Sequence, residues 1–234
     1  MPNGGRRRHL TIAYVAVVAG ALLLPVVSAL SPFEHRIDPV PRADSGSHAF
    51  TARQRDGRGP VGYDPCRPIR VAVNPVGAPP GWRELIDTAI AHVSGPSGLR
   101  FDVIGLTDDR PGEIWDPVDG YGPVLVSWAS RSETVGLEGD TVGRGFSTSI
   151  LDRGRSYYVT GEVTLDPDQF LRLTERPDAG TVLQPILDHE FGHLVGLAHV
   201  DDEGELMNAD NLGRTTWGPG DLAGLALLGR LPCR

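Results

Sequence analysis

The segment HEFGHLVGLAH places three histidines and a glutamate close enough in the chain to form one metal site. His189 and His193 are four residues apart, so on a helix both imidazoles project from the same face, with Glu190 beside them. Gly196 can adopt the left-handed conformation that ends a helix, and the turn brings His199 back toward the other two. Three neutral imidazoles with one open position are the ligand set of a catalytic zinc ion, so the sequence predicts one here.

The pattern HExxHxxGxxH resembles the metzincin zinc-binding motif, and this version is most similar to that of the matrixins. Downstream, Glu205, Leu206 and Met207 resemble the methionine turn of these families, and the final WGPGDLAGLALLG resembles the matrixin C-terminal helix. The resemblance is specific over residues 184–229 and only topological over residues 66–183.

The resemblance implies a zinc-dependent endopeptidase that hydrolyses extracellular proteins or peptides. Glu190 would be its catalytic general base, taking a proton from the attacking water, and Met207 would be an apolar floor beneath the zinc rather than a ligand. In matrixins the substrate lies antiparallel to an edge strand, and we expect residues 139–146 to contain that edge. The implied structural residue is Gly196, and the implied zinc ligands are His189, His193 and His199.

Two departures from the matrixin pattern limit these expectations. Asn208 and Ala209 follow the turn methionine, where matrixins usually have Tyr-Pro. His92 is the only histidine between residues 66 and 188, so we expect one catalytic zinc and no second, structural ion. Calcium is a possible further cofactor, and the alternative is that the acidic residues concerned simply form a solvated surface. The candidate ligands are Asp140, Asp152, Asp166 and Asp168.

The elements that must position this site are predicted from apolar periodicity. Residues 131–156 are glycine-rich and predict a long irregular loop, and Asp221 is placed to cap the last helix. Pro185 fits a helix only in its first turn. The fold class is mixed α/β: a metzincin-like zinc protease domain with a twisted mixed sheet, an active-site helix and a C-terminal helix. Strands are expected at 69–73, 99–106, 124–128 and 157–165, and helices at 80–93, 183–195 and 222–228.

The N-terminal region predicts export. Arg6, Arg7 and Arg8 precede an apolar run over residues 10–30, which is typical of a signal peptide cleaved after Ala29 or of an uncleaved membrane anchor. Residues 31–60 are expected to be a flexible linker or short pro-segment, and residues 61–234 the catalytic domain. Either alternative places the domain outside the cytoplasm, secreted or anchored by residues 10–30 to the outer face of the membrane.

Composition narrows the partners and the state of the cysteines. The 234 residues carry a net charge of −8, which argues against nucleic acid as a partner. The expected partner is a protein or peptide substrate, with membrane contact only through an uncleaved N-terminal segment, and the protein is expected to be a monomer. Cys66 and Cys233 are the only cysteines and bracket the domain, so a disulfide is expected; the alternative is Cys66 as an inhibitory thiolate on the zinc.

Two other functions remain open at this point. One is a noncatalytic extracellular zinc-binding module that keeps the metzincin fold, although the intact Glu190 argues against it. The other is a zinc hydrolase that acts on a non-protein substrate, which the motif alone does not distinguish from a peptidase.

Overall fold

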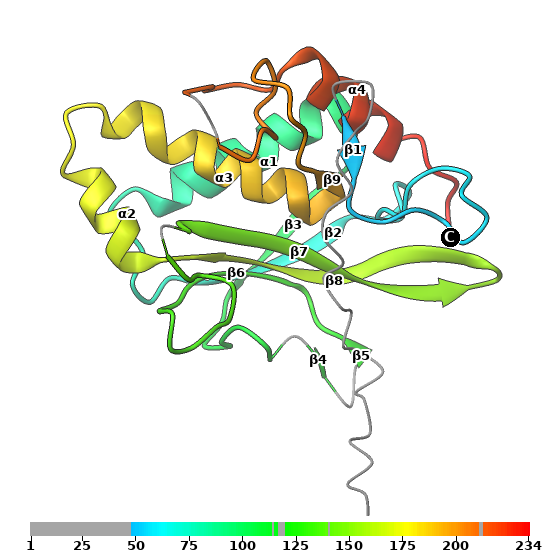
Figure 1. Cartoon of the computed structure of the whole chain (residues 1–234). Coiled ribbons are helices and arrows are strands. Elements are labelled where there is room, and N and C mark those ends of the chain that lie inside the picture. The colour runs from blue at the N-terminus through cyan, green and yellow to red at the C-terminus, as the bar shows by residue number, and fades with distance from the viewer. Residues whose placement is uncertain (1–47, 114, 117–119, 140, 211–212) are drawn as a thin grey trace, which may run out of the picture. The chain divides into compact units, whose positions relative to one another are not determined.

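A five-stranded mixed sheet covered by helices forms the body of the protein (Figure 1). The computed structural model describes residues 48–234, apart from residues 114, 117–119, 140 and 211–212. The strands are β1 (Ala49–Phe50), β2 (Ile69–Asn74), β3 (Phe101–Leu106), β4 (Trp115–Asp116), β5 (Gly120–Tyr121), β6 (Val124–Trp128), β7 (Gly143–Asp152), β8 (Arg155–Leu165) and β9 (Leu197–Ala198). The helices are α1 (Trp82–Ser97), α2 (Pro167–Thr174), α3 (Ala179–Val195) and α4 (Pro219–Leu228). The mixed α/β fold class is thereby confirmed.

The sheet has the strand order β3-β2-β6-β8-β7. Strand β2 is parallel to β3 and β6, and β6 is parallel to β8, whereas β7 runs antiparallel to β8 and forms one edge. The expected irregular loop over residues 131–156 is wrong for most of its length, because residues 143–152 form the edge strand β7. Glycine, serine and threonine occupy half of its positions, so a prediction based on apolar alternation does not detect this strand.

Helix α3 lies over the sheet and is longer than expected. It begins at Ala179 rather than at residue 183, so Pro185 lies inside the helix and not in its first turn. The side chains of Leu187, Phe191 and Leu194 on this helix are completely buried in the core. That packing stabilises a helix whose proline removes one backbone hydrogen bond, and it fixes the orientation of the opposite face.

Two other helices also differ from expectation. Helix α2 was not predicted, although Asp166 followed by Pro167 is a start signal, and the Asp166 carboxylate accepts a hydrogen bond from the Gln169 N–H. Helix α4 begins at Pro219, three residues earlier than expected. Asp221 therefore lies inside its first turn, from where its carboxylate accepts a hydrogen bond from the Gly218 N–H.

The described chain begins in the folded body rather than in a linker. Ala49 and Phe50 are buried, and their strand β1 pairs antiparallel with β9, next to the histidine segment. The Gln54 side chain also bonds Ser156 in both directions. Residues 48–60 thus differ from the flexible segment expected over 31–60. The expected export signal or anchor over residues 1–30, and residues 31–47, lie outside the described residues; within the part described, no helix is long and apolar enough to cross a membrane.

A disulfide joins Cys66, before β2, to Cys233, after α4. The two cysteines are separated by 167 residues in the chain, and their Cα atoms lie 5.6 Å apart. The bond therefore connects the beginning of the sheet to the end of the last helix, and it leaves Cys66 no free thiolate for a metal.

We expect replacement of both cysteines by serine to destabilise the domain. In the chain-entropy model, opening a loop of this length costs about 5 kcal/mol of unfolding free energy, less where the unfolded chain keeps structure. Urea unfolding of the double variant measures the loss. Thiol titration of the denatured, unreduced parent is the control, and two free thiols in it would contradict the disulfide.

Candidate metal centre and active site

The three histidines of the motif converge on one point. His189 and His193 are one turn apart on α3, and their ring centroids are 4.7 Å from each other. The Nε2 atom of His199 lies 3.0 Å from the Nε2 atoms of both. Three ring nitrogens from two segments of the chain therefore face the same small volume.

Gly196 makes this convergence possible. Its φ of 124° ends α3, and β9 then leads the chain back to His199. A Cβ atom at Gly196 would lie 3.2 Å from the Tyr158 ring and from the Val61 carbonyl oxygen. A side chain here would therefore be strained by the backbone conformation and crowded by its neighbours.

Backbone carbonyls determine which ring nitrogen of two histidines carries the proton. His189 Nδ1 lies 2.8 Å from the Leu206 oxygen, and His193 Nδ1 lies 2.8 Å from the Leu197 oxygen. A carbonyl only accepts hydrogen bonds, so both Nδ1 atoms must donate. Both Nε2 atoms then present lone pairs to the shared volume, which is the arrangement of histidines that ligate a metal.

The electrostatics of the cluster keep the imidazoles neutral. Burial lowers the pKa of His189 to about 4, against the opposing effect of the Leu206 carbonyl. Burial also lowers the pKa of His193 well below its usual value, and that of His199 in the same direction. Neutral ring nitrogens that face each other at 3.0 Å can share a bound cation. Three nitrogen ligands that leave a fourth coordination position open are typical of catalytic zinc. Among the described residues, His189, His193 and His199 also form a group able to hold a metal ion.

Glu190 is enclosed between α3 and the edge strand β7. Burial raises the pKa of its carboxyl to about 8, while the Gly145 N–H, which donates to it, and the Arg144 guanidinium lower that pKa. A Cβ atom at Gly143 would lie 3.0 Å from Glu190 Oε1, and one at Gly145 would lie 2.1 Å from the Glu190 carbonyl oxygen. The two alternate glycines thus let β7 approach the carboxylate directly. Apolar periodicity does not reveal these two glycines, and the alternation Gly-x-Gly in residues 143–145 is their only signal in the sequence.

Met207 packs directly against α3 between the two helical histidines. It is almost fully buried, and its Sδ atom lies only 2.6 Å from the position that a Cβ atom would occupy at Gly192. Gly192 lies between His189 and His193 on the helix, so only glycine leaves room for the sulfur. The structure thus places Met207 against the turn of α3 that carries His189 and His193.

Two buried carboxylates hold the turn that precedes Met207. Asp221 accepts a hydrogen bond from the Leu206 N–H, and Glu205 accepts from the N–H groups of Gly220 and Asp221. The Leu206 carbonyl is the acceptor for His189, so only the backbone of Leu206 lies between Asp221 and that histidine. Burial raises the pKa of Asp221 to about 6, and the N–H groups of Gly218 and Leu206 counter this. From the sequence alone, Asp221 was expected only as a helix cap.

The aspartates considered for calcium are used elsewhere. Asp152 pairs with Arg234 at 2.9 Å, and Asp166 caps α2 and pairs with Arg131 at 3.2 Å. Asp168 is exposed in the first turn of α2, and Asp140 lies outside the described residues. No group of potential metal ligands within the described ranges includes these residues, so calcium is not supported.

A family model matches the segment that contains the histidines. Residues 123–212 match the family model described as matrixin. Two solved structures show limited similarity. Archaemetzincin from Methanopyrus kandleri has 18% identity and a TM-score of 0.39, and the match covers 68% of this chain and 86% of that one. The GM1-bound form of the ECX AB5 holotoxin has 14% identity and a TM-score of 0.38, with 69% and 80% covered. A search of curated proteins gives no significant match.

The matched segment runs from β6 through the histidine triad and the methionine turn. It confirms the resemblance that the motif indicated: residues 123–212 are similar to the matrixin family.

Proposed function

We propose that the protein is a zinc-dependent endopeptidase. The observation that carries the proposal is the convergence of three imidazole Nε2 atoms, two of them with the Nδ1 proton held by a carbonyl, next to the buried carboxylate of Glu190. His189, His193 and His199 would hold the ion. When bound, zinc supplies Lewis acidity, which polarises a carbonyl and lowers the pKa of water from 15.7 to about 7.

Glu190 provides the proton transfer. Its carboxylate lies next to two metal ligands in the chain and is anchored by the Gly145 N–H, so it is available to take a proton from the attacking water and to deliver it to the leaving amine. A buried position excludes competing solvent and brings the basicity of the carboxylate closer to neutral pH, which suits a group that first accepts and then donates a proton.

The edge strand β7 supports a peptide as the substrate. It is bonded to β8 on one side and lies at the end of the sheet, and its first residues approach Glu190 through Gly143 and Gly145. An extended peptide can add to such an edge by main-chain hydrogen bonds, with its carbonyl groups carried past the catalytic carboxylate. This region overlaps the segment 139–146 in which the substrate edge was expected.

We further propose that the enzyme works outside the cytoplasm, secreted or membrane-anchored, as a monomer on proteins or peptides. The disulfide between Cys66 and Cys233 supports an oxidising compartment. The apolar residues 10–30, which follow a cluster of arginines, also support export from the cytoplasm.

Zinc content tests the ligand assignment. We expect His199→Ala to lose bound zinc and activity together, because the ion keeps only two imidazoles. Glu203→Ala is the matched control: this exposed carboxylate is four residues away in the chain and outside the metal-ligating group. Full zinc content in purified His199→Ala, measured by atomic emission, would show that the third ligand lies elsewhere.

Kinetics on a peptide library test the role of Glu190. We expect Glu190→Gln to retain zinc and substrate affinity and to lose ~10²–10⁴-fold in kcat, the usual contribution of a positioned general base. Glu203→Gln, an exposed carboxylate in the loop after His199, should behave like the parent. A zinc-loaded parent that cleaves no peptide in a broad library would refute the endopeptidase.

The contact between Asp221 and Leu206 has its own test. The N–H groups of Leu206 and Gly218 both donate to Oδ2 of Asp221, and asparagine offers only a neutral carbonyl oxygen in that place, which accepts weaker hydrogen bonds than a carboxylate does. We expect Asp221→Asn to weaken zinc binding roughly 10- to 100-fold, as loss of an outer partner of a ligand histidine does. Competition with a chelator measures this, with exposed Asp168→Asn as the control; equal zinc affinity in both variants would show that Asp221 has only a structural role.

A further inference from the structure

A second hollow lies away from the histidine triad, at the end of the sheet where β2 and β6 begin. It has a volume of about 380 Å³, and its wall includes Ile69, Val124 and Val159. Val159 is four residues from Val163, the partner of Gly145 in the β7–β8 pair, which corresponds to about 13 Å along an extended strand. None of the lining residues belongs to the metal centre, so this is a separate site.

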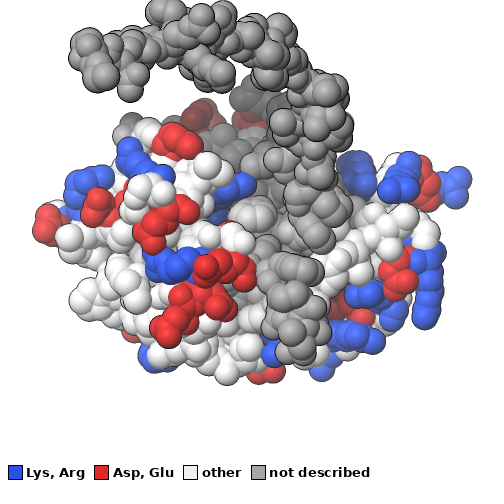
Figure 2. Space-filling model, turned by 90° about the horizontal axis from the view of Figure 1, so that it is seen from below, with Lys and Arg blue, Asp and Glu red and all other residues white. Residues whose placement is uncertain are grey.

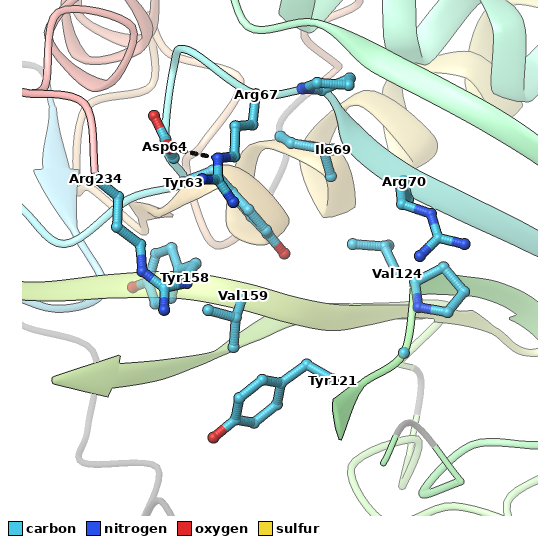
Figure 3. A pocket seen from close by; sticks show the side chains of 13 residues that line it. Tyr63, Asp64, Arg67, Ile69, Arg70, Tyr121, Val124, Tyr158, Val159 and Arg234 are labelled. Carbon is cyan, nitrogen blue, oxygen red and sulfur yellow. Dashed lines mark ion pairs between the residues drawn. The ribbon is translucent and has the colours of Figure 1, made fainter. Parts of the chain in front are cut away.

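Three arginines surround this hollow (Figure 3). Arg67 comes from the loop before β2, Arg70 from β2, and Arg234 from the segment after α4, and their guanidinium groups lie on different sides of it. The only acidic side chain in the lining is Asp64. In a chain of net charge −8, such a cluster is not a consequence of bulk composition; on the face that Figure 2 views, basic and acidic side chains are intermixed.

The positive charges are only partly compensated by the protein. Arg67 is mostly exposed and lies with its Nε 3.5 Å from Asp64, which is too far for a good hydrogen bond. Arg234 uses its Nε to bond Asp152 at 2.9 Å. Arg70 forms no ion pair with any of the residues that the structure describes. Like charges brought together in this way repel each other, and a bound anion would remove that cost.

The disulfide is what brings two of these arginines together. Arg67 directly follows Cys66, and Arg234 directly follows Cys233. The turn around Cys66 is itself fixed, because the Asp64 carboxylate accepts from the Cys66 N–H and Arg100 donates to the Cys66 carbonyl. The hollow is therefore built on a covalently fixed frame rather than on a free chain end.

The chemistry of the lining indicates the class of ligand. A guanidinium group presents a planar fork of donors that matches the oxygens of a carboxylate or phosphate. A volume near 380 Å³ lies in the range of small-molecule sites, which is about 300–1,000 Å³. A single inorganic ion is too small to contact all three guanidinium groups across such a hollow. The partly exposed ring of Tyr121 and the side chain of Val159 add apolar surface for a carbon skeleton. We propose that this hollow binds a small organic polyanion that carries two or more carboxylate or phosphate groups.

Calorimetric titration of the full, oxidised chain with two probes tests the proposal. Propane-1,2,3-tricarboxylate represents carboxylates, and fructose 1,6-bisphosphate represents phosphates. We expect saturable binding of at least one probe with one site per chain, weaker when salt is raised from about 50 mM to about 500 mM because the arginines are exposed to solvent. The probe that binds more tightly identifies the preferred oxyanion.

Variants at exposed arginines locate the binding. We expect Arg67→Gln and Arg70→Gln each to weaken it about tenfold or more, since each removes a charged donor pair. Arg172→Gln on α2, an equally exposed arginine at the other end of the molecule, should leave it unchanged. Absence of saturable binding of both probes would overturn the proposal. Binding that Arg70→Gln leaves intact would also overturn it, because a probe bound at the zinc centre would behave in that way. Binding that Arg172→Gln weakens as much as Arg70→Gln does would overturn it too.

Discussion

The backbone of Leu206 connects the metal centre to the rest of the fold. Its carbonyl oxygen accepts a hydrogen bond from His189 Nδ1, and its N–H donates to Asp221 on α4. A histidine can present a lone pair to a metal only if its other nitrogen keeps the proton, so this carbonyl determines both the tautomer and the direction of the ligand. The second histidine is set in the same way by the Leu197 carbonyl, immediately after the helix. The ligand geometry therefore depends on where two backbone carbonyls lie.

The second constraint is that β7 and Met207 lie very close to the backbone of α3. Glycines at these contacts make the short distances possible. Strand β7 lies against Glu190 because Gly143 and Gly145 carry no side chain on the facing side. Met207 reaches the helix because Gly192 leaves space for its sulfur. An alanine at any of these three positions would displace the carboxylate, the edge strand or the methionine, since protein interiors are packed too densely to absorb an extra carbon at such distances.

The parts of the site that depend on short-range spacing were predictable from the sequence, and the parts that depend on long-range packing were not. One helical turn separates His189 from His193, and one glycine turns the chain toward His199, so the triad follows from local rules. Strand β7 was missed because its stability comes from pairing with β8 and packing on α3 rather than from its own apolar residues. The crossed hydrogen bonds of Glu205 and Asp221 join segments 15 or 16 residues apart, and no periodicity indicates them. The pairing of β1 with β9 is similarly non-local, which is why residues 48–60 read as a linker.

The zinc triad and the arginine-lined hollow differ in the charge and the solvent exposure of their side chains. Burial keeps the imidazoles neutral, so the first site gains its charge only with a metal ion, whereas the hollow keeps three permanent cations partly exposed. Exposed charges separated by more than a Debye length, about 8 Å at physiological ionic strength, hardly influence each other. An anion in the hollow therefore has little direct electrostatic effect on Glu190 or its metal ligands. Strand β8 connects the two sites, because it lines the hollow at Tyr158 and Val159, pairs with Gly145 at Val163, and holds the Tyr158 ring beside Gly196. The strand has one register against β7, with a shift at Val159, and coupling requires an element with two alternative arrangements. The physical expectation is therefore two sites that act independently.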